Sequence, residues 1–418
     1  MGPSEIEQVL QADTPATAVR KPAAIDRWLA ARVQRSIAPS AVRIELWDGT
    51  SPYCDAAPPV GSFVVHDRRT LVGLALDPDL QFGEAYMFGR LEVRGPLQPV
   101  IDALTGTAQR TRISWRDRLA LMLPNTLSAS RRNVHTHYDL GNDFYQLWLD
   151  RDLVYTCAYY ADDQMSLDEA QRAKLDLVCR KLRLRPGERV VETGCGWGAL
   201  ALHMARHYGV HVRAFNISRE QLSYARERAA REGLQDRVEF IDDDYRNVSG
   251  QYDAFVSVGM LEHVGLPHLG AVGDVLRRTI RPDGGRGLLH FIGRDVPHPL
   301  NAWIRRRVFP GAYTPTIAEV ATHTLAPADM SIIDVENLRL HYARTLAHWS
   351  ERFALATDRV RQKYGHEFHR AWELYLAGSQ AAFATGWMQL FQILFVPNGS
   401  APPSWTRSDP YKVPRVTE

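Results

Sequence analysis

The chain has few cysteines, no long apolar run and almost no net charge, and each shortage excludes a class of protein. Its 4 cysteines form no CxxC pair, so we expect neither a metal site nor structural disulfides, as in a reducing cytosol. No stretch of about 18 apolar residues is available to span a bilayer. The N-terminus lacks the basic and apolar segments of a signal peptide. The sequence therefore predicts a soluble cytoplasmic protein.

The formal net charge of +2 argues against a nucleic-acid partner, because binding to many phosphates requires a strongly basic surface. Basic residues do gather locally, at Arg110–Arg118, Arg131–Arg132 and Arg305–Arg307. Each cluster is either a solvated face or a contact with an anionic membrane surface, where one basic side chain contributes about 1 kcal/mol.

The length of 418 residues is too great for one ordinary core and indicates two domains. We expect a flexible tail over residues 1–24, a small α+β domain over 25–104, a linker over 105–132 and a larger domain over 133–418. Within the small domain, strand composition occurs at residues 41–49, 62–67 and 71–76.

Strand and helix patterns alternate in the larger domain from residue 186 onward. The expected strands are residues 189–193, 210–217, 237–241, 252–261 and 286–293. The expected helices are residues 199–209, 218–233, 269–281 and, in a mostly helical C-terminal third, 342–365. Ser218 and Gln221 have the spacing of a capping box at a helix start. This alternation predicts an α/β fold with a doubly wound parallel sheet.

A glycine-rich loop follows the first of these strands, in the stretch VVETGCGWG from Val190 to Gly198. Glycines let a backbone turn tightly and approach a ligand closely, although a plain tight turn explains such loops too. Glu192 precedes the loop and gives the acidic-x-G-x-G-x-G pattern of class I methyltransferases. Dinucleotide-binding folds favour G-x-G-x-x-G instead, and an acidic residue would repel their pyrophosphate. The pattern suits the cationic methionine end of S-adenosylmethionine.

Polar residues also end the next two strands. Asn216 in FNIS has the chemistry to bind the ribose or methionine portion of such a cofactor, and Asp244 and Tyr245 in DDDY suit its adenine. Taken alone, DDD is typical of a solvated loop. Three strand ends in series with suitable polar groups favour an S-adenosylmethionine site.

The chain resembles the cyclopropane-fatty-acyl-phospholipid synthase family, which is related to the mycolic acid cyclopropane synthases. The matching stretches, in family order, are NVHTHYDLGNDFYQLWLD (133–150), YTCAYY (155–160), AQRAKLDLVCRKL (170–182), GCGWG (194–198), SVGMLEHVG (257–265), LLHFIG (288–293) and HYARTLAHWSERF (341–353). The small domain resembles the family's N-terminal lipid-binding domain more loosely. Glu192 stands where the family usually has aspartate.

This resemblance implies a Rossmann-like class I methyltransferase sheet with helical insertions and a set of cofactor-binding residues. That set is Tyr155, Thr156, Glu192, Gly194, Cys195, Gly196, Gly198, Asn216, Ile217, Ser218, Gln221, Asp244 and Tyr245. It also implies methyl transfer from S-adenosylmethionine to the cis double bond of phospholipid acyl chains. The protein would then work at the inner membrane face as a peripheral enzyme, and the family allows a homodimer.

The resemblance further implies a bound bicarbonate ion, which serves as the base that closes a cyclopropane ring. The matching residues are Cys157, Glu262, His290, Ile292 and Tyr342. His290 and Tyr342 would donate from side chains, Cys157 and Ile292 from the backbone, and Glu262 would orient the ion next to the cofactor loop, facing the transferred methyl. Singly, Cys157, His290 and Tyr342 are typical of core packing.

Two further groups stay open between function and packing. Aromatic side chains suited to an acyl channel, or to a plain core, are Tyr138, Phe144, Tyr145, Trp148, Tyr155, Tyr159 and Tyr160. His263, beside Glu262, is expected to be a solvated loop residue. The alternative products are methylene- or methyl-branched chains, and the alternative of another class is a lipid- or cofactor-binding protein without turnover.

Overall fold

The computed structural model describes residues 21–52, 58–108, 140–401, 406–407 and 411. The chain divides into two compact units, Met1–Thr107 and Ala108–Glu418. The division falls near the start of the expected linker, most of which, like most of the expected tail, lies outside the described residues. Among the described helices, none combines the length and the apolar character that crossing a bilayer requires.

The first unit is a small α+β domain with a three-stranded sheet. Its elements are α2 (Ala24–Ile37), β1 (Val42–Leu46), β2 (Gly61–Val65), α3 (Arg68–Leu76), α4 (Pro78–Met87), β3 (Leu91–Arg94) and α5 (Leu97–Ala108). Strand β2 is central, parallel to β1 and antiparallel to β3. Residues 71–76, expected as a strand, belong to helix α3. The Asp67 side chain caps that helix by accepting from the Thr70 amide, and Leu71 and Leu74 bury one helical face.

The second unit contains a seven-stranded sheet in the order β6-β5-β4-β7-β8-β10-β9. The strands are β4 (Arg189–Thr193), β5 (His211–Asn216), β6 (Val238–Asp242), β7 (Ala254–Val258), β8 (Arg286–Gly293), β9 (Met330–Asn337) and β10 (Gln389–Pro397). Strands β6, β5, β4, β7 and β8 are parallel, as the alternating pattern predicts. Strand order reverses between β4 and β7, which is where ligands bind in such sheets.

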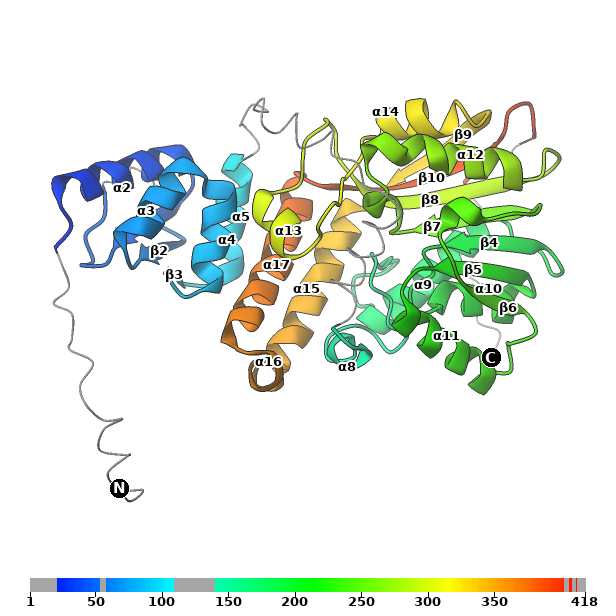
Figure 1. Cartoon of the computed structure of the whole chain (residues 1–418), viewed down its shortest axis with the longest axis horizontal. Coiled ribbons are helices and arrows are strands. Elements are labelled where there is room, and N and C mark those ends of the chain that lie inside the picture. Colours follow the sequence, from blue (N-terminus) through cyan, green and yellow to red (C-terminus); the bar gives the residue numbers. More distant parts are fainter. Residues whose placement is uncertain (1–20, 53–57, 109–139, 402–405, 408–410, 412–418) are drawn as a thin grey trace, which may run out of the picture. The chain divides into compact units, whose positions relative to one another are not determined.

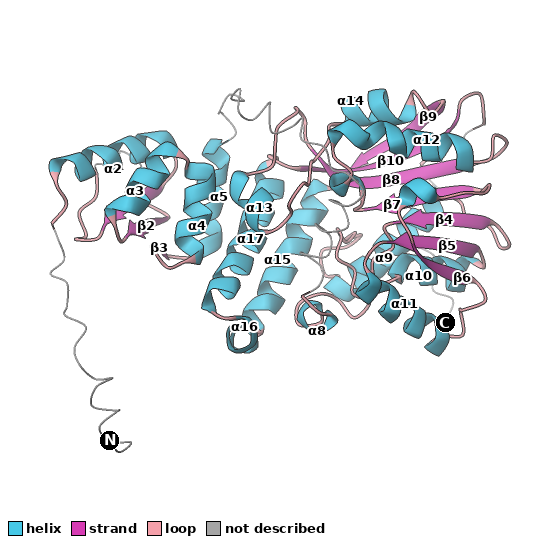
Figure 2. Ribbon diagram, in the orientation of Figure 1, coloured by secondary structure: helices cyan, strands magenta, loops and turns pink. Residues whose placement is uncertain are grey.

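Helices cover both faces of this sheet (Figures 1 and 2). One face packs against α9 (Leu167–Lys181), α10 (Ala199–Tyr208) and α11 (Arg219–Arg231), and the other against α12 (Leu269–Thr279) and α14 (Ile317–Val320). Adjacent residues of one strand enter different cores, Val190 on the first face and Val191 on the second. Burial on both faces explains why these strands read as continuous apolar runs.

Two expectations for the C-terminal third need correction. The helix expected over residues 342–365 is two helices, α15 (Arg339–Leu355) and α16 (Thr357–Tyr364), followed by α17 (His366–Thr385). Strands β9 and β10 were not expected, and β10 runs antiparallel to both of its neighbours. The short helices of this unit are α8 (Asn142–Tyr145), α13 (Ala302–Arg307), η1 (Tyr245–Asn247), η2 (Leu261–His263), η3 (Leu266–His268) and η4 (Ala321–Leu325).

Candidate active site

A cavity opens beyond the carboxyl ends of β4, β5 and β7, with about 1080 Å³ of empty space including its mouth. This volume suits a small-molecule site. Every residue of the expected cofactor set lines it except Gly198 and Ser218. Those two begin helices α10 and α11 at the cavity's edge. The structure therefore brings the expected residues together from four separate segments of the chain.

The glycine-rich loop has the backbone that its sequence predicts. Gly194 and Gly196 both have positive φ, +81° and +54°, which glycine adopts without strain. A Cβ atom on Gly194 would lie 2.8 Å from the Met260 Cβ, whereas one on Gly196 would meet nothing within 4 Å. Gly194 thus permits close packing of β4 against the residues after β7, and Gly196 leaves room on the cavity side.

A buried carboxyl and a buried amine line the same cavity. The Glu192 Oε2 atom has no hydrogen-bond partner among the described residues, and burial raises the pKa of this carboxyl to about 8, against the attraction of Lys174. Lys174, from α9, donates to the Thr156 hydroxyl at 2.8 Å, and burial lowers the pKa of its amine to about 8. The two groups match the opposite charges of the amino-acid end of S-adenosylmethionine, so the residues present fit this cofactor.

Sequence reasoning missed Lys174. A signal was present, because Lys174 stands at helical spacing from Ala170, Leu177 and Val178, which form an apolar helix face. A lysine is almost never fully buried unless its ammonium is paired with a polar group.

Asn216 connects the glycine loop to helix α11. Its side chain donates to the Gly196 carbonyl at 3.2 Å and to Gln221 Oε1 at 2.8 Å, and accepts from the amides of Ile217 and Ser218. The expected capping box is only half formed: Ser218 accepts from the Gln221 amide, but Gln221 bonds to Asn216 instead of back to Ser218. Asn216 therefore shapes the cavity wall through its neighbours.

Asp244 and Tyr245 close the cavity beyond β6. Asp244 is buried and accepts from the Arg246 amide at 3.0 Å as the cap of η1. The Arg246 guanidinium lies 5.1 Å from the centre of the Tyr245 ring. Asp243, which was not singled out, also lines the cavity.

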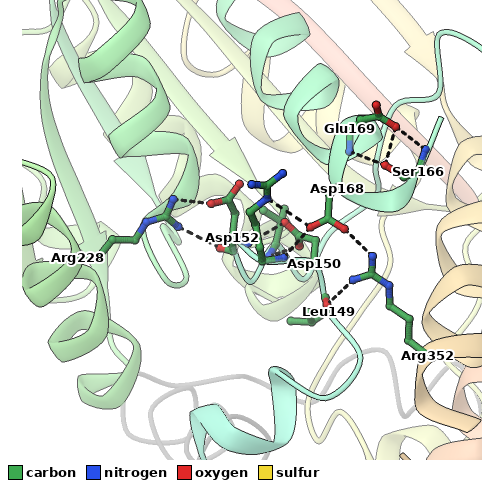
Figure 3. Close-up of polar contacts among 10 residues, drawn as sticks. Leu149, Asp150, Asp152, Ser166, Asp168, Glu169, Arg228 and Arg352 are labelled. Atoms are coloured by element: carbon green, nitrogen blue, oxygen red, sulfur yellow. Dashed lines mark hydrogen bonds and ion pairs between the residues drawn. The ribbon is translucent and has the colours of Figure 1, made fainter. Parts of the chain in front are cut away.

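The segment that carries Tyr155 and Thr156 is fastened at its base by ion pairs and backbone caps (Figure 3). Asp150 accepts from the amides of Asp152 and Val154 at 3.0 and 2.8 Å. Asp152 pairs with Arg228 of α11 at 2.5 Å. On the other side, Arg352 of α15 bridges the Leu149 carbonyl and Asp168 of α9. Three helices thus fix the path of the chain into the cavity.

The described aromatic residues separate into three groups. Phe144, Tyr145 and Trp148 are fully buried and make ring contacts with one another, so core packing accounts for them. Tyr155 lines the cavity, and its hydroxyl lies 2.8 Å from that of Tyr375. The other members lie elsewhere: Tyr159 and Tyr160 stack on His341, and Tyr138 falls outside the described residues.

Glu262 and Ile292 of the expected bicarbonate site are in direct contact. Glu262, in η2, accepts from the Ile292 amide at 2.5 Å, so this amide donates to the carboxyl in the present structure. The second oxygen of Glu262, Oε2, is buried without a hydrogen-bond partner among the described residues. Burial raises the pKa of Glu262 to about 7. Glu262 itself does not line the cavity described above.

His290 lies two residues before Ile292 on β8, with its carbonyl bonded to the Gly259 amide at the end of β7. Its Nδ1 atom is 3.0 Å from the Gln392 amide nitrogen, and its Nε2 atom is buried without a hydrogen-bond partner in the described part of the chain. Burial, with help from Lys174 and Lys181, lowers the pKa of His290 well below its usual value. The imidazole is therefore neutral.

Cys157 and Tyr342 meet at Leu338, the residue before α15. The Cys157 thiol donates to the Ala158 carbonyl and approaches the Leu338 carbonyl at 3.8 Å, while the Tyr342 amide bonds to that same carbonyl. Burial raises the pKa of the thiol, so Cys157 stays protonated. The structure thus groups the five expected residues as two pairs, Glu262 with Ile292 and Cys157 with Tyr342, and His290 by itself.

The expectation for His263 was wrong. His263 lines the cavity, and its ring packs 6.0 Å from that of Phe309. Burial lowers the pKa of His263 to about 4, so it is a neutral wall of the cavity rather than a solvated loop residue. Glu262 and His263 are consecutive residues of η2, yet only His263 lines the cavity.

Residues 125–393 match a family described as mycolic acid cyclopropane synthetase, which is more than half of the chain. The chain belongs to this family. It is accordingly an S-adenosylmethionine-dependent methyltransferase of the cyclopropane synthase type. Residues 31–111 match a domain of unknown function (DUF7884), so a lipid-binding role for the first unit stays a proposal.

Relatives of this cyclopropane synthase family member carry two kinds of name. A probable fatty acid methyltransferase of Pseudomonas putida is 36% identical over 382 residues, covering 89% of this chain and 96% of that protein. The cyclopropane-fatty-acyl-phospholipid synthase of Escherichia coli (strain K12) is 39% identical over 260 residues, covering 62% of this chain and 66% of that protein.

Solved structures show the same fold. The cyclopropane synthase MmaA2 from Mycobacterium tuberculosis and the mycolic acid cyclopropane synthase CmaA1 complexed with SAH and CTAB each have a TM-score of 0.60 and 29% identity. Each comparison covers 63% of this chain and 97% of the other.

Proposed function

We propose that this enzyme methylates the cis double bond of unsaturated phospholipid acyl chains and closes a cyclopropane ring with the help of a bound bicarbonate ion. The observation that carries the proposal is that Glu262 Oε2 and His290 Nε2 are both buried without a hydrogen-bond partner among the residues that the structure describes. Buried polar groups are otherwise almost always hydrogen-bonded. An acceptor and an imidazole nitrogen left in this state fit a small oxyanion that also carries a proton.

The cofactor cavity supports the first half of the reaction. S-adenosylmethionine, when bound, supplies an electrophilic methyl group on a sulfonium. Glu192 and Lys174 would hold the ammonium and carboxylate of its amino-acid end, and the open side of Gly196 admits close approach. Attack by the acyl double bond on the methyl group forms a carbon–carbon bond, and the electron pair of the carbon–sulfur bond leaves with sulfur.

The residues around Glu262 support the second half. After the attack the acyl chain carries a positive charge, and a ring forms when the added methyl group loses a proton, because its C–H electrons make the last bond. Bicarbonate, when bound, would supply the base. Glu262 in its ionised form would accept the ion's own proton, and His290 would donate to its oxygen. Tyr342 and the backbone at Cys157 would complete the set of donors.

A branched product is a second candidate, and one observation favours it. The relative that spans 89% of this chain is named a probable fatty acid methyltransferase, and a further relative, 33% identical over 348 residues, is named tuberculostearic acid methyltransferase UfaA1. If a hydride shift first moved the positive charge to the methylated carbon, loss of a proton from the added methyl group would leave a methylene branch, and reduction of that double bond by a separate hydride-donating reductase would give a methyl branch.

The test supplies S-adenosylmethionine with a fully deuterated methyl group and vesicles of phospholipids with cis-unsaturated chains, then analyses the fatty acids by mass spectrometry. The proposal expects a ring product that retains two of the three deuterons and resists mild hydrogenation. A product with two deuterons that takes up hydrogen is a methylene branch. A saturated product two hydrogens heavier than the ring is a methyl branch, which keeps two deuterons when it forms by reduction of the methylene, and either result overturns ring closure.

A further inference from the structure

Three side chains from three different elements form a continuous row that ends at His290. Lys181, in the last turn of α9, is buried and donates to Gln392 Oε1 of β10 at 2.7 Å. The same ammonium bonds to Glu336 of β9 and lies 4.0 Å from Asp334. The Gln392 nitrogen faces His290 Nδ1 at 3.0 Å. All three members of the row are almost completely buried.

The direction of each hydrogen bond in this row is fixed by chemistry. A lysine ammonium has only donors, so it must meet the oxygen of the Gln392 amide and not its nitrogen. The NH₂ group of Gln392 then points at His290, and an amide nitrogen can only donate. His290 Nδ1 must therefore accept through its lone pair. A neutral imidazole with a free lone pair on Nδ1 carries its single proton on Nε2.

We propose that Gln392, oriented by Lys181, is a positioning residue that fixes His290 in the tautomer protonated on Nε2, so that His290 presents a donor to the base anion. The role of that donor rests on the proposed function. The assignment accounts for the unpartnered Nε2 atom, because the tautomer places its one N–H where the described residues offer no acceptor.

The opposite tautomer of His290, protonated on Nδ1, would not bind the base anion. A lone pair on Nε2 would face an anion and repel it, and the Nδ1–H group would meet the NH₂ of Gln392 donor against donor. Gln392 and Lys181 thus act on the reaction through His290 without touching the reacting atoms. The buried ion pair with Glu336 keeps Lys181 in place and prevents Gln392 from turning over.

The tautomer is measured in the full-length protein with ¹⁵N-labelled histidine by NMR. His290 is assigned among the 15 histidines by comparison with His290→Asn. We expect a protonated Nε2 and an unprotonated Nδ1 in the resting enzyme. In Gln392→Glu, a carboxylate that only accepts should draw the proton to Nδ1. A resting enzyme with the proton on Nδ1, or an unchanged tautomer in Gln392→Glu, overturns the proposal.

Kinetics supply the second readout. Loss of one oxyanion donor lowers kcat by about 10²- to 10³-fold, so we expect a fall of about 10²-fold in Gln392→Glu with an unchanged KM for S-adenosylmethionine. The bicarbonate concentration needed for half-maximal rate should rise. Gln392→Met, which keeps the volume and removes the amide, should lower kcat as well and serves if the glutamate variant fails to fold.

Gln389→Met is the matched control. Gln389 is a buried glutamine of the same strand, but its amide bonds to Asp295, Asn337 and the Gly386 carbonyl. We expect it to retain both the tautomer and the rate. An equal fall in kcat in both methionine variants would mean that β10 acts only as structure. The NMR measurement of the tautomer needs no turnover. An enzyme that forms no ring product would therefore overturn the proposed function, and the NMR measurement would still decide whether Gln392 fixes the tautomer of His290.

Discussion

At the scale of single residues, the site depends on polar groups held away from water without full compensation. Such groups are costly, and an enzyme that retains them gains either binding energy for a ligand or a shifted pKa. Glu192, Lys174, Glu262 and His290 all have pKa values displaced by burial. Replacing Glu192 or Lys174 should therefore affect cofactor binding, and replacing Glu262 or His290 should affect loss of the proton.

Glu262→Gln should lower kcat by about 10²- to 10⁴-fold, the range for loss of acid–base assistance, because the amide cannot accept and orient a proton as the carboxylate does. The affinity for S-adenosylmethionine, measured by calorimetry, should change little since Glu262 does not line the cofactor cavity. The exposed Glu239 offers a control as Glu239→Gln. A collapse of cofactor affinity in Glu262→Gln would show that its role is binding.

The shifted pKa of Glu262 also predicts that the free energy of unfolding depends on pH, and the Glu262→Gln variant tests this. Burial raises the pKa of Glu262 from 4.5 to about 7, so between these values the folded protein keeps a proton that the unfolded chain releases. The stabilisation from the protonated carboxyl is present below pH 4.5 and is lost as pH rises to about 7, by about 3 kcal/mol at most. Urea unfolding of wild type and Glu262→Gln at pH 5 and pH 8 should show wild type losing stability relative to the variant. A constant difference would contradict this.

Lys174→Met should weaken S-adenosylmethionine binding by about 10- to 100-fold, the loss expected for a charge-assisted hydrogen bond. The effect should be smaller for an analogue that lacks the methionine carboxylate, because the Lys174 ammonium of the wild-type protein would then have no carboxylate to bind. Lys363→Met, at an exposed lysine, is the control. Equal losses for both ligands would indicate a general collapse of the cavity.

At the scale of elements, the chain path from Leu149 to Thr156 forms part of the wall of the cofactor cavity. Asp150→Asn leaves only one side-chain oxygen for the two backbone amides that the carboxylate serves, so about 1–3 kcal/mol of stability should be lost. The KM for S-adenosylmethionine should rise because Tyr155 and Thr156 lose their fixed base. Thermal unfolding and steady-state kinetics test both expectations, with Asp163→Asn, at an exposed aspartate, as the control. An unchanged KM would show that the ion pairs alone hold the segment.

Local pattern predicted some elements and missed others for identifiable reasons. Strand β8 is expected and observed over the same residues, 286–293, because it is apolar on both faces and bounded by turns. Residues 71–76 were misread because a short apolar run fits a buried strand and a helix equally, and the Asp67 cap decided for helix. Strand β10 was missed because its partners, β8 and β9, are distant in sequence.

The candidate site was predictable only where its residues lie in motifs. The glycine loop and the strand ends predicted the cofactor cavity, and the helical spacing around Lys174 carried a signal that was missed. His263 and Gln392, in contrast, reach the site through packing that no local spacing reveals. Half of the expected capping box was absent because Asn216 competes for the Gln221 side chain.

At the scale of the whole molecule, the first unit exposes large apolar side chains, including Trp28 at 52% and Leu76 at 80%. If this unit brings the enzyme to lipid, the double variant Trp28→Ser, Leu76→Ser should lower its co-sedimentation with vesicles of unsaturated anionic phospholipid by at least about tenfold, since each buried apolar side chain contributes about 1.5–3 kcal/mol. Leu355→Ser, at a 90% exposed leucine of the second unit, is the control. Unchanged sedimentation of the double variant would contradict a lipid-binding role.

Strand β8 has a parallel neighbour, β7, on one side and an antiparallel one, β10, on the other. The parallel side leads to the cavity proposed to bind the methyl donor, and the antiparallel side carries Gln392, proposed to set the protonation of His290. Evolution can therefore change methyl transfer and proton loss separately, through different strands. Substitutions on β9 and β10 would change the rate at which the added methyl group loses its proton, while the residues proposed to bind the methyl donor stay unaltered from ancestor to descendant.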